Sequence, residues 1–112
     1  MTLIREADLI ESIAEALQFV ACFHPPDFLR ALAAAWERET NPAASQAMAQ
    51  ILVNSRLCAI GRRPICQDTG TANIAVEVGA KARLDLSGSL QEAVDEATRR
   101  AWRREANPLR AS

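Results

Sequence analysis

The sequence predicts an α+β fold that is rich in helix, with three helices, a loop, a short β-hairpin and a last helix in that order. Three observations support this prediction. Apolar residues recur at helical spacing in four separate stretches. Apolar and polar residues alternate in the stretch that follows residue 70, as they do in half-buried strands. Prolines, glycines and a capping sequence separate these stretches at the points where helices start and stop.

The first helix is expected over residues 6–21, where Ile10, Ile13 and Leu17 share one face. A break follows at residues 24–26, because the two successive prolines there cannot continue a helix. The histidine that opens this break is the only one in the chain. We interpret it as a capping or packing residue, since a zinc site needs about four clustered ligands.

The second helix is expected from Pro26 to Glu39, and a proline suits the first turn of a helix. Asn41 is predicted to cap the third helix, with Pro42 at its first position. Gly61 is predicted to end that helix in the left-handed conformation. Both helices are rich in alanine, which predicts close packing of helix against helix.

A hairpin is predicted from residues 71–78 and 81–86, which both alternate and are separated by Gly79. The pattern Ser89-Leu90-Gln91-Glu92 is typical of a capping box and predicts the start of the last helix. A two-stranded hairpin is marginally stable by itself. We therefore expect further strands from a longer chain or from another subunit.

Composition and charge exclude several classes of function. The chain has 112 residues, 49% of them hydrophobic and 24% charged, which is ordinary for a single globular domain. The net charge of −1 gives no overall attraction to nucleic acid or to an anionic membrane, so we expect neither as a partner. The start of the sequence lacks the pattern of a signal peptide, and the three cysteines do not form a disulfide framework. We therefore expect reduced thiols and a cytoplasmic location.

The loop at residues 62–70 reads Arg-Arg-Pro-Ile-Cys-Gln-Asp-Thr-Gly and holds most of the chemistry in the chain. It places a soft metal ligand, Cys66, beside the polar side chains of Gln67 and Asp68. The ordinary structural interpretation is a small packed cysteine followed by an Asp-Thr-Gly turn. The residues by themselves leave both interpretations open, a structural turn and a ligand-binding loop.

Residues 54–70 resemble a sequence near the N-terminus of class I, iron–sulfur-dependent fumarate hydratases. The alpha chains of the related two-subunit fumarases and tartrate dehydratases carry a similar stretch. Residues 16–19 and 41–44 resemble the opening helices of the family, and residues 107–112 resemble a later segment. The resemblance therefore covers nearly the whole chain. Members of the family are several times longer, so we interpret residues 1–112 as the N-terminal part of the catalytic domain.

The resemblance implies a hydro-lyase that hydrates fumarate reversibly to L-malate. It implies a [4Fe-4S] cluster that three cysteines hold, so that one iron keeps an open position. Carried over residue by residue, it makes Cys66 a cluster ligand and places Gln67 and Asp68 in the substrate pocket. Asp68 is also the candidate for proton transfer or substrate orientation. Arg110 matches, less closely, an arginine that binds a substrate carboxylate.

Cys22 and Cys58 do not match the sequence contexts of the other two cluster ligands. We interpret Cys22 as a core or helix-end residue and Cys58 as a packing residue. This chain then holds one of three expected ligands, and the remainder of the chain or a companion subunit must supply the others. The resemblance also implies a small dicarboxylate substrate and a homo-oligomer when the enzyme is complete. Two alternatives stay open, a tartrate dehydratase-like subunit and a non-catalytic helical interaction module.

Overall fold

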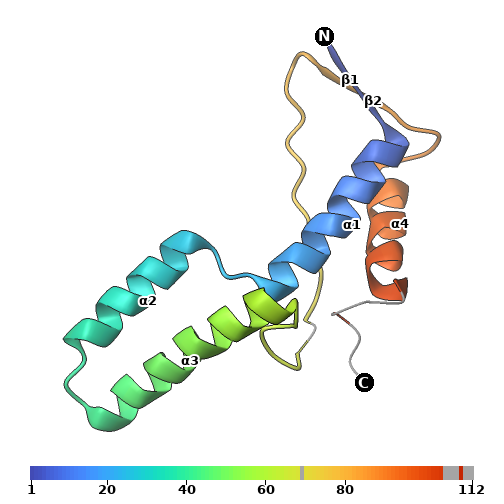
Figure 1. The fold of residues 1–112 in the computed structure, drawn as a ribbon. Coiled ribbons are helices and arrows are strands. Elements are labelled where there is room, and N and C mark those ends of the chain that lie inside the picture. The colour runs from blue at the N-terminus through green and yellow to red at the C-terminus, as the bar shows by residue number, and fades with distance from the viewer. Residues whose placement is uncertain (69, 105–108, 110–112) are drawn as a thin grey trace. The chain divides into compact units, whose positions relative to one another are not determined.

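The structure, a computed structural model, describes residues 1–68, 70–104 and 109. Within these residues the elements follow the order β1 (Thr2–Arg5), α1 (Glu6–Cys22), α2 (Pro26–Arg38), α3 (Pro42–Gly61), β2 (Ala82–Asp85) and α4 (Leu90–Arg103) (Figure 1). The predicted α+β class is therefore confirmed. The chain divides into two compact units, one of residues 1–19 and 68–112 and one of residues 20–67. No helix in the described residues is long and apolar enough to span a membrane.

The sheet of the first unit differs from the predicted hairpin. β2 pairs in parallel with β1, in a register that sets Thr2 opposite Ala82. A turn precedes β2, where the Ala82 amide donates to the Gly79 carbonyl at 2.9 Å, and the Thr2 amide donates to the Lys81 carbonyl at 2.9 Å. Residues 71–78 form no strand, so the hairpin prediction is wrong.

The alternation in residues 71–78 has another physical cause. Ala72 and Ile74 are half-buried, and the stretch from residue 71 to 75 lines a hollow together with Val94 and Thr98 of α4. Alternation indicates only that one side of an extended chain is apolar. Here α4 lines the same hollow as residues 71–75, whereas Val76 and Val78 of the same apolar side stay exposed.

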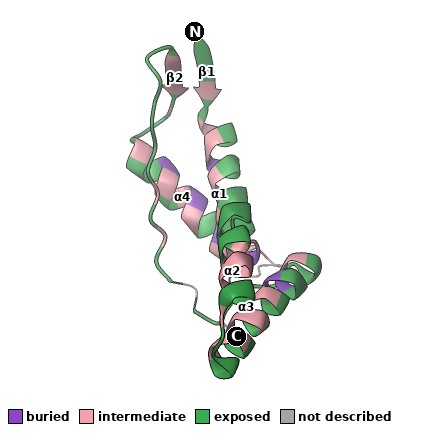
Figure 2. Cartoon of the chain, turned by 90° about the vertical axis from the view of Figure 1, so that its left-hand side faces the viewer, coloured by how far each residue is buried: buried purple, intermediate pink, exposed green. Residues whose placement is uncertain are grey.

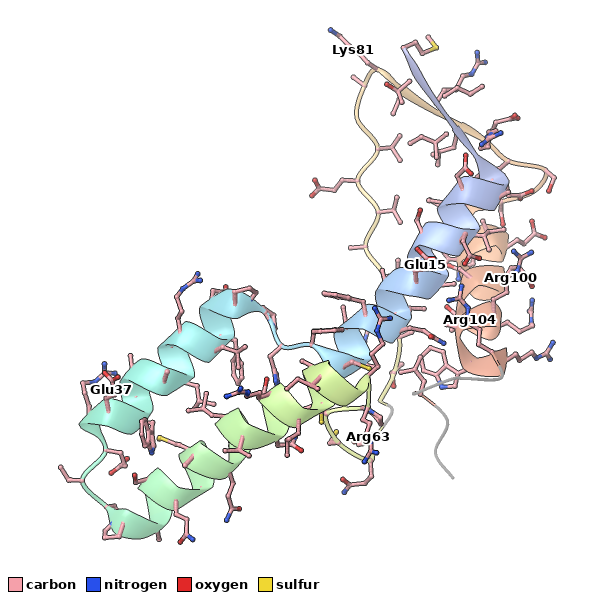
Figure 3. The ribbon with its side chains drawn as sticks, viewed as in Figure 1. Glu15, Glu37, Arg63, Lys81, Arg100 and Arg104 are labelled. Carbon is pink, nitrogen blue, oxygen red and sulfur yellow. The ribbon has the colours of Figure 1, made fainter. Side chains whose placement is uncertain are left out.

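The core of the first unit lies where α1 meets α4. Ile10 of α1 packs with Ala93 and Ala97 of α4, and all three residues are buried (Figure 2). The small side chains of Ala93 and Ala97 leave room for Ile10 to pack against α4. Arg104, which follows α4, forms an ion pair with Glu11 of α1 (Figure 3).

The ends and the exposed face of α4 follow the sequence closely. The Ser89 hydroxyl accepts from the Glu92 amide at 3.1 Å, and the Glu92 carboxylate accepts from the Ser89 amide at 2.7 Å, which confirms the capping box. On the exposed face, Glu96 forms ion pairs with Arg100, at 2.8 Å, and with Arg99. Both arginines lower the pKa of the Glu96 carboxyl, mainly by donating hydrogen bonds to it.

The second unit is built on α2 and α3, which lie side by side (Figure 1). The Asn41 side chain accepts from the amides of Ala43 and Ala44 at 3.0 and 3.2 Å, so the predicted cap of α3 is confirmed. His24 stacks on Phe28 with ring centroids 4.9 Å apart, and its Nδ1 lies 2.9 Å from the buried Ser55 hydroxyl. His24 therefore packs and bonds within this unit, as predicted.

Candidate functional site

The candidate site begins where α3 ends. The last helical residue is Gly61, and the residue in the left-handed conformation is Arg62, with φ 49° and ψ 52°. The prediction that Gly61 takes this conformation is therefore wrong by one residue. A left-handed arginine costs roughly 1–2 kcal/mol, because its Cβ approaches the next carbonyl oxygen. The Arg63 amide donates to the Cys58 carbonyl at 3.0 Å, which satisfies one of the last carbonyls of the helix.

Three contacts anchor the loop between Arg63 and Cys66. The Ile65 amide donates to the Ala21 carbonyl at 2.9 Å. The Asn54 side-chain amide donates to the Ile65 carbonyl at 2.9 Å. The Cys58 thiol lies 3.4 Å from the Pro64 carbonyl, within the range of a weak S–H···O contact. The backbone immediately before Cys66 is therefore tied both to the end of α1 and to α3.

The three cysteines occupy different environments, and none forms a disulfide. Cys66 is exposed, whereas Cys22 and Cys58 are 3% and 6% exposed. Burial raises the pKa of the Cys22 thiol above its ordinary value, and the neighbouring Cys58 raises it further against an opposing effect of Arg62. Their burial confirms the interpretation of Cys22 as a core or helix-end residue and of Cys58 as a packing residue. Cys66 is the thiol that solvent reaches.

The remaining predicted site residues follow Cys66 along the chain. Gln67 and Asp68 are both exposed. The Asp68 carboxylate accepts from the Gly70 amide at 2.8 Å, and Gly70 has a φ of 60°, a backbone conformation that glycine adopts without steric cost. Asp68 thus forms the turn that the sequence favoured, while its role in chemistry stays a prediction. Arg110 lies outside the described residues.

The donor set fits an iron–sulfur cluster only in part. Cys66 supplies one accessible thiol on an anchored loop, and thiolates are the ligands that such clusters use. Across residues 1–68, 70–104 and 109, no group of three or more His, Cys, Asp or Glu side chains could hold a metal ion. Among the described residues Cys66 is therefore the one accessible thiol that we consider as a candidate cluster ligand, and a cluster with three cysteine ligands would need two further thiols from elsewhere.

Sequence reasoning missed the side chains that anchor the loop. Asn54 and Cys58 are four residues apart, which places them on the same face of α3. The helical spacing of a polar side chain and a thiol just before the loop was the available signal. This spacing was not decisive, because helices carry many polar side chains at i, i+4 spacing that make no contact with a loop.

Comparison with known proteins gives one match. The family model for fumarate hydratase (Fumerase) matches residues 10–112. No curated protein matches the chain. No solved structure matches it either.

Proposed function

Since the chain belongs to the fumarate hydratase (Fumerase) family, we propose that it forms part of the active site of a hydro-lyase that interconverts fumarate and L-malate. The observation that carries this proposal is the loop of residues 62–70. Within the matched region it presents an exposed thiol, Cys66, followed directly by Gln67 and Asp68. Its backbone is anchored on both sides of Ile65.

We propose that Cys66 is one of three cysteine ligands of a [4Fe-4S] cluster with an open iron position. When bound, such a cluster supplies a Lewis acid that can polarise a hydroxyl and a carboxylate of the substrate. Gln67 would orient the substrate by hydrogen bonds, and Asp68 would hold or move a proton at its carboxylate. Arg110 is proposed to bind a substrate carboxylate, because its planar guanidinium matches a carboxylate in two parallel hydrogen bonds.

The complete enzyme, as we propose it, contains this chain and the segment or companion subunit that supplies the other two thiols. We further propose that it is a homo-oligomer in the cytoplasm, where reducing conditions keep cysteine thiols reduced. Its substrate is a small dicarboxylate. The 112-residue chain alone is expected to show no hydratase activity after anaerobic treatment with iron and sulfide, because it offers one suitable ligand. Malate formation by the isolated chain with a stoichiometric cluster would contradict this.

The proposal is tested by replacing single cysteines in the complete enzyme. Cys66→Ser should lose the cluster, since a serine oxygen is a poor substitute for thiolate on iron. Cys58→Ser is the matched control, because Cys58 is buried and a hydroxyl fits its place. Iron and sulfide content, visible absorption and turnover with fumarate and with tartrate are measured for each variant. Equal cluster loss in both folded variants would contradict the assignment, and a preference for tartrate would identify the dehydratase-like alternative.

A further inference from the structure

We propose that Asn54 and Cys58 of α3 are positioning residues, which hold the backbone before Cys66 so that its thiol is presented in one orientation. The role of Cys66 as a ligand rests on the proposed function. The anchoring of the loop rests on the contacts of residues 20–67 alone.

The first step is the backbone that these side chains fix. The carbonyl of Pro64, the amide of Ile65 and the carbonyl of Ile65 each have a partner, at 3.4, 2.9 and 2.9 Å. The Ile65 carbonyl belongs to the planar peptide group that ends at the Cα atom of Cys66. Fixing this plane limits the orientation of the Cys66 side chain to rotation about its own backbone and χ1 dihedrals.

The second step is the contact between the two anchoring side chains. The Cys58 thiol lies 3.6 Å from the Asn54 Oδ1 atom as well as 3.4 Å from the Pro64 carbonyl. A thiol carries a single hydrogen, so it donates to one of these oxygens at a time. When it donates to Oδ1, it orients the Asn54 amide with Nδ2 toward the Ile65 carbonyl. Cys58 thus supports the loop directly and through Asn54.

The third step separates a positioning role from simple stability. Contacts that only stabilised α3 would join residues within the helix, whereas the Asn54 side chain reaches a carbonyl eleven residues further along the chain. That carbonyl is adjacent to the thiol for which a ligand role is proposed. Loss of the Asn54 contact should therefore change the behaviour of Cys66 more than it changes the helix.

Asn54→Asp tests this in the complete enzyme freed of its cluster. Aspartate keeps the size of the side chain and Oδ1 but loses the Nδ2 donor, and it sets a carboxylate oxygen against the Ile65 carbonyl. Hydrogen exchange of the Ile65 amide and alkylation of Cys66 should both become about tenfold faster, the scale of one lost hydrogen bond. The matched control is Asn73→Asp. The Asn73 side-chain amide also donates to a loop carbonyl, that of Thr71 at 3.3 Å, and its loss should leave the Ile65 exchange rate and the Cys66 alkylation rate unchanged.

Cys58 supplies a second test, with rescue by a conservative variant, in the enzyme loaded with its cluster. Cys58→Ala removes the donor and should speed loss of the cluster to a chelator and, after one-electron reduction with dithionite, broaden the electron paramagnetic resonance signal of the reduced cluster. Cys58→Ser restores a donor and should restore both properties. An unchanged Ile65 exchange rate in Asn54→Asp would overturn the inference. The inference would also be overturned if Cys66→Ser lost the cluster while Asn54→Asp and Cys58→Ala kept it with an unchanged electron paramagnetic resonance signal. A cluster that survives Cys66→Ser would instead overturn the proposed function, and the Ile65 exchange rate would still report whether the loop is anchored.

Discussion

Asp68→Asn in the complete enzyme separates the turn that the structure shows from the chemistry that we propose. The Asp68 carboxylate accepts the Gly70 amide at 2.8 Å, and asparagine can accept the same bond through Oδ1. Asparagine cannot carry a proton at neutral pH. The variant should therefore fold and keep its cluster, while turnover with fumarate falls by roughly a hundredfold or more, the usual scale for an acid–base group.

The magnitude decides between the two roles. Asp68 is exposed, so the turn bond competes with water and contributes about 1 kcal/mol at most. If the turn were the whole role, even complete loss of that bond in Asp68→Ala would lower turnover by about fivefold at most. The assay is turnover per cluster for both variants, with folding checked by circular dichroism. Near-normal turnover in Asp68→Asn, together with a modest loss of turnover in Asp68→Ala, would refute the catalytic role. Asp68 would then have only a structural role in the turn.

Two further predictions concern titratable groups. In protein freed of any cluster, Cys66 should react with iodoacetamide much faster than Cys22 at pH 8, because burial raises the pKa of Cys22 and limits access to it; peptide mass mapping measures both rates, and equal rates would contradict the burial of Cys22. The pKa of Glu96 is lowered by its hydrogen bonds to arginine, so its contribution to stability is present above the ordinary glutamate pKa of about 4.3 and is lost as the pH falls through the lower folded value. Glu96→Gln should therefore flatten the decline in melting temperature below pH 5, whereas the exposed Glu77→Gln should not; the same decline in both variants would sink the assignment.

Local signals made most of the fold predictable from the sequence. The first three helices lie within a residue of their predicted bounds, and the last starts where its capping box predicts, because caps such as Asn41 and Ser89 act on the residues next to them. The sheet was not predictable in this way. β1 and β2 are about eighty residues apart in the chain, and the sequence of Thr2–Arg5 carries no sign of the strand with which it pairs. The alternation of residues 71–78 predicted a strand, whereas only Ala72 and Ile74 of the apolar side are half-buried and Val76 and Val78 are exposed.

The candidate site was predictable as a list of residues but not as an arrangement. The resemblance identified Cys66, Gln67 and Asp68, and the structure shows an accessible thiol and an aspartate turn at these positions. The interpretation of Cys22 as a core or helix-end residue and of Cys58 as a packing residue agrees with their burial, but the side chains that cover each thiol could not be identified from the sequence. The bond from Asn54 to the Ile65 carbonyl was hidden for a similar reason, because it depends on where the loop turns back after α3.

The location of these anchors has a consequence for cluster assembly. A cluster whose ligands come from different segments forms more readily when each thiol is already held in its binding orientation, because less conformational entropy is lost on binding. Ala21, Asn54 and Cys58, which hold the loop before Cys66, belong to the same compact unit as the loop itself, residues 20–67. They need no contribution from the cluster or from the other two proposed ligands. The contacts of the loop with α1 and α3 would therefore hold the proposed ligand, Cys66, on an already anchored backbone.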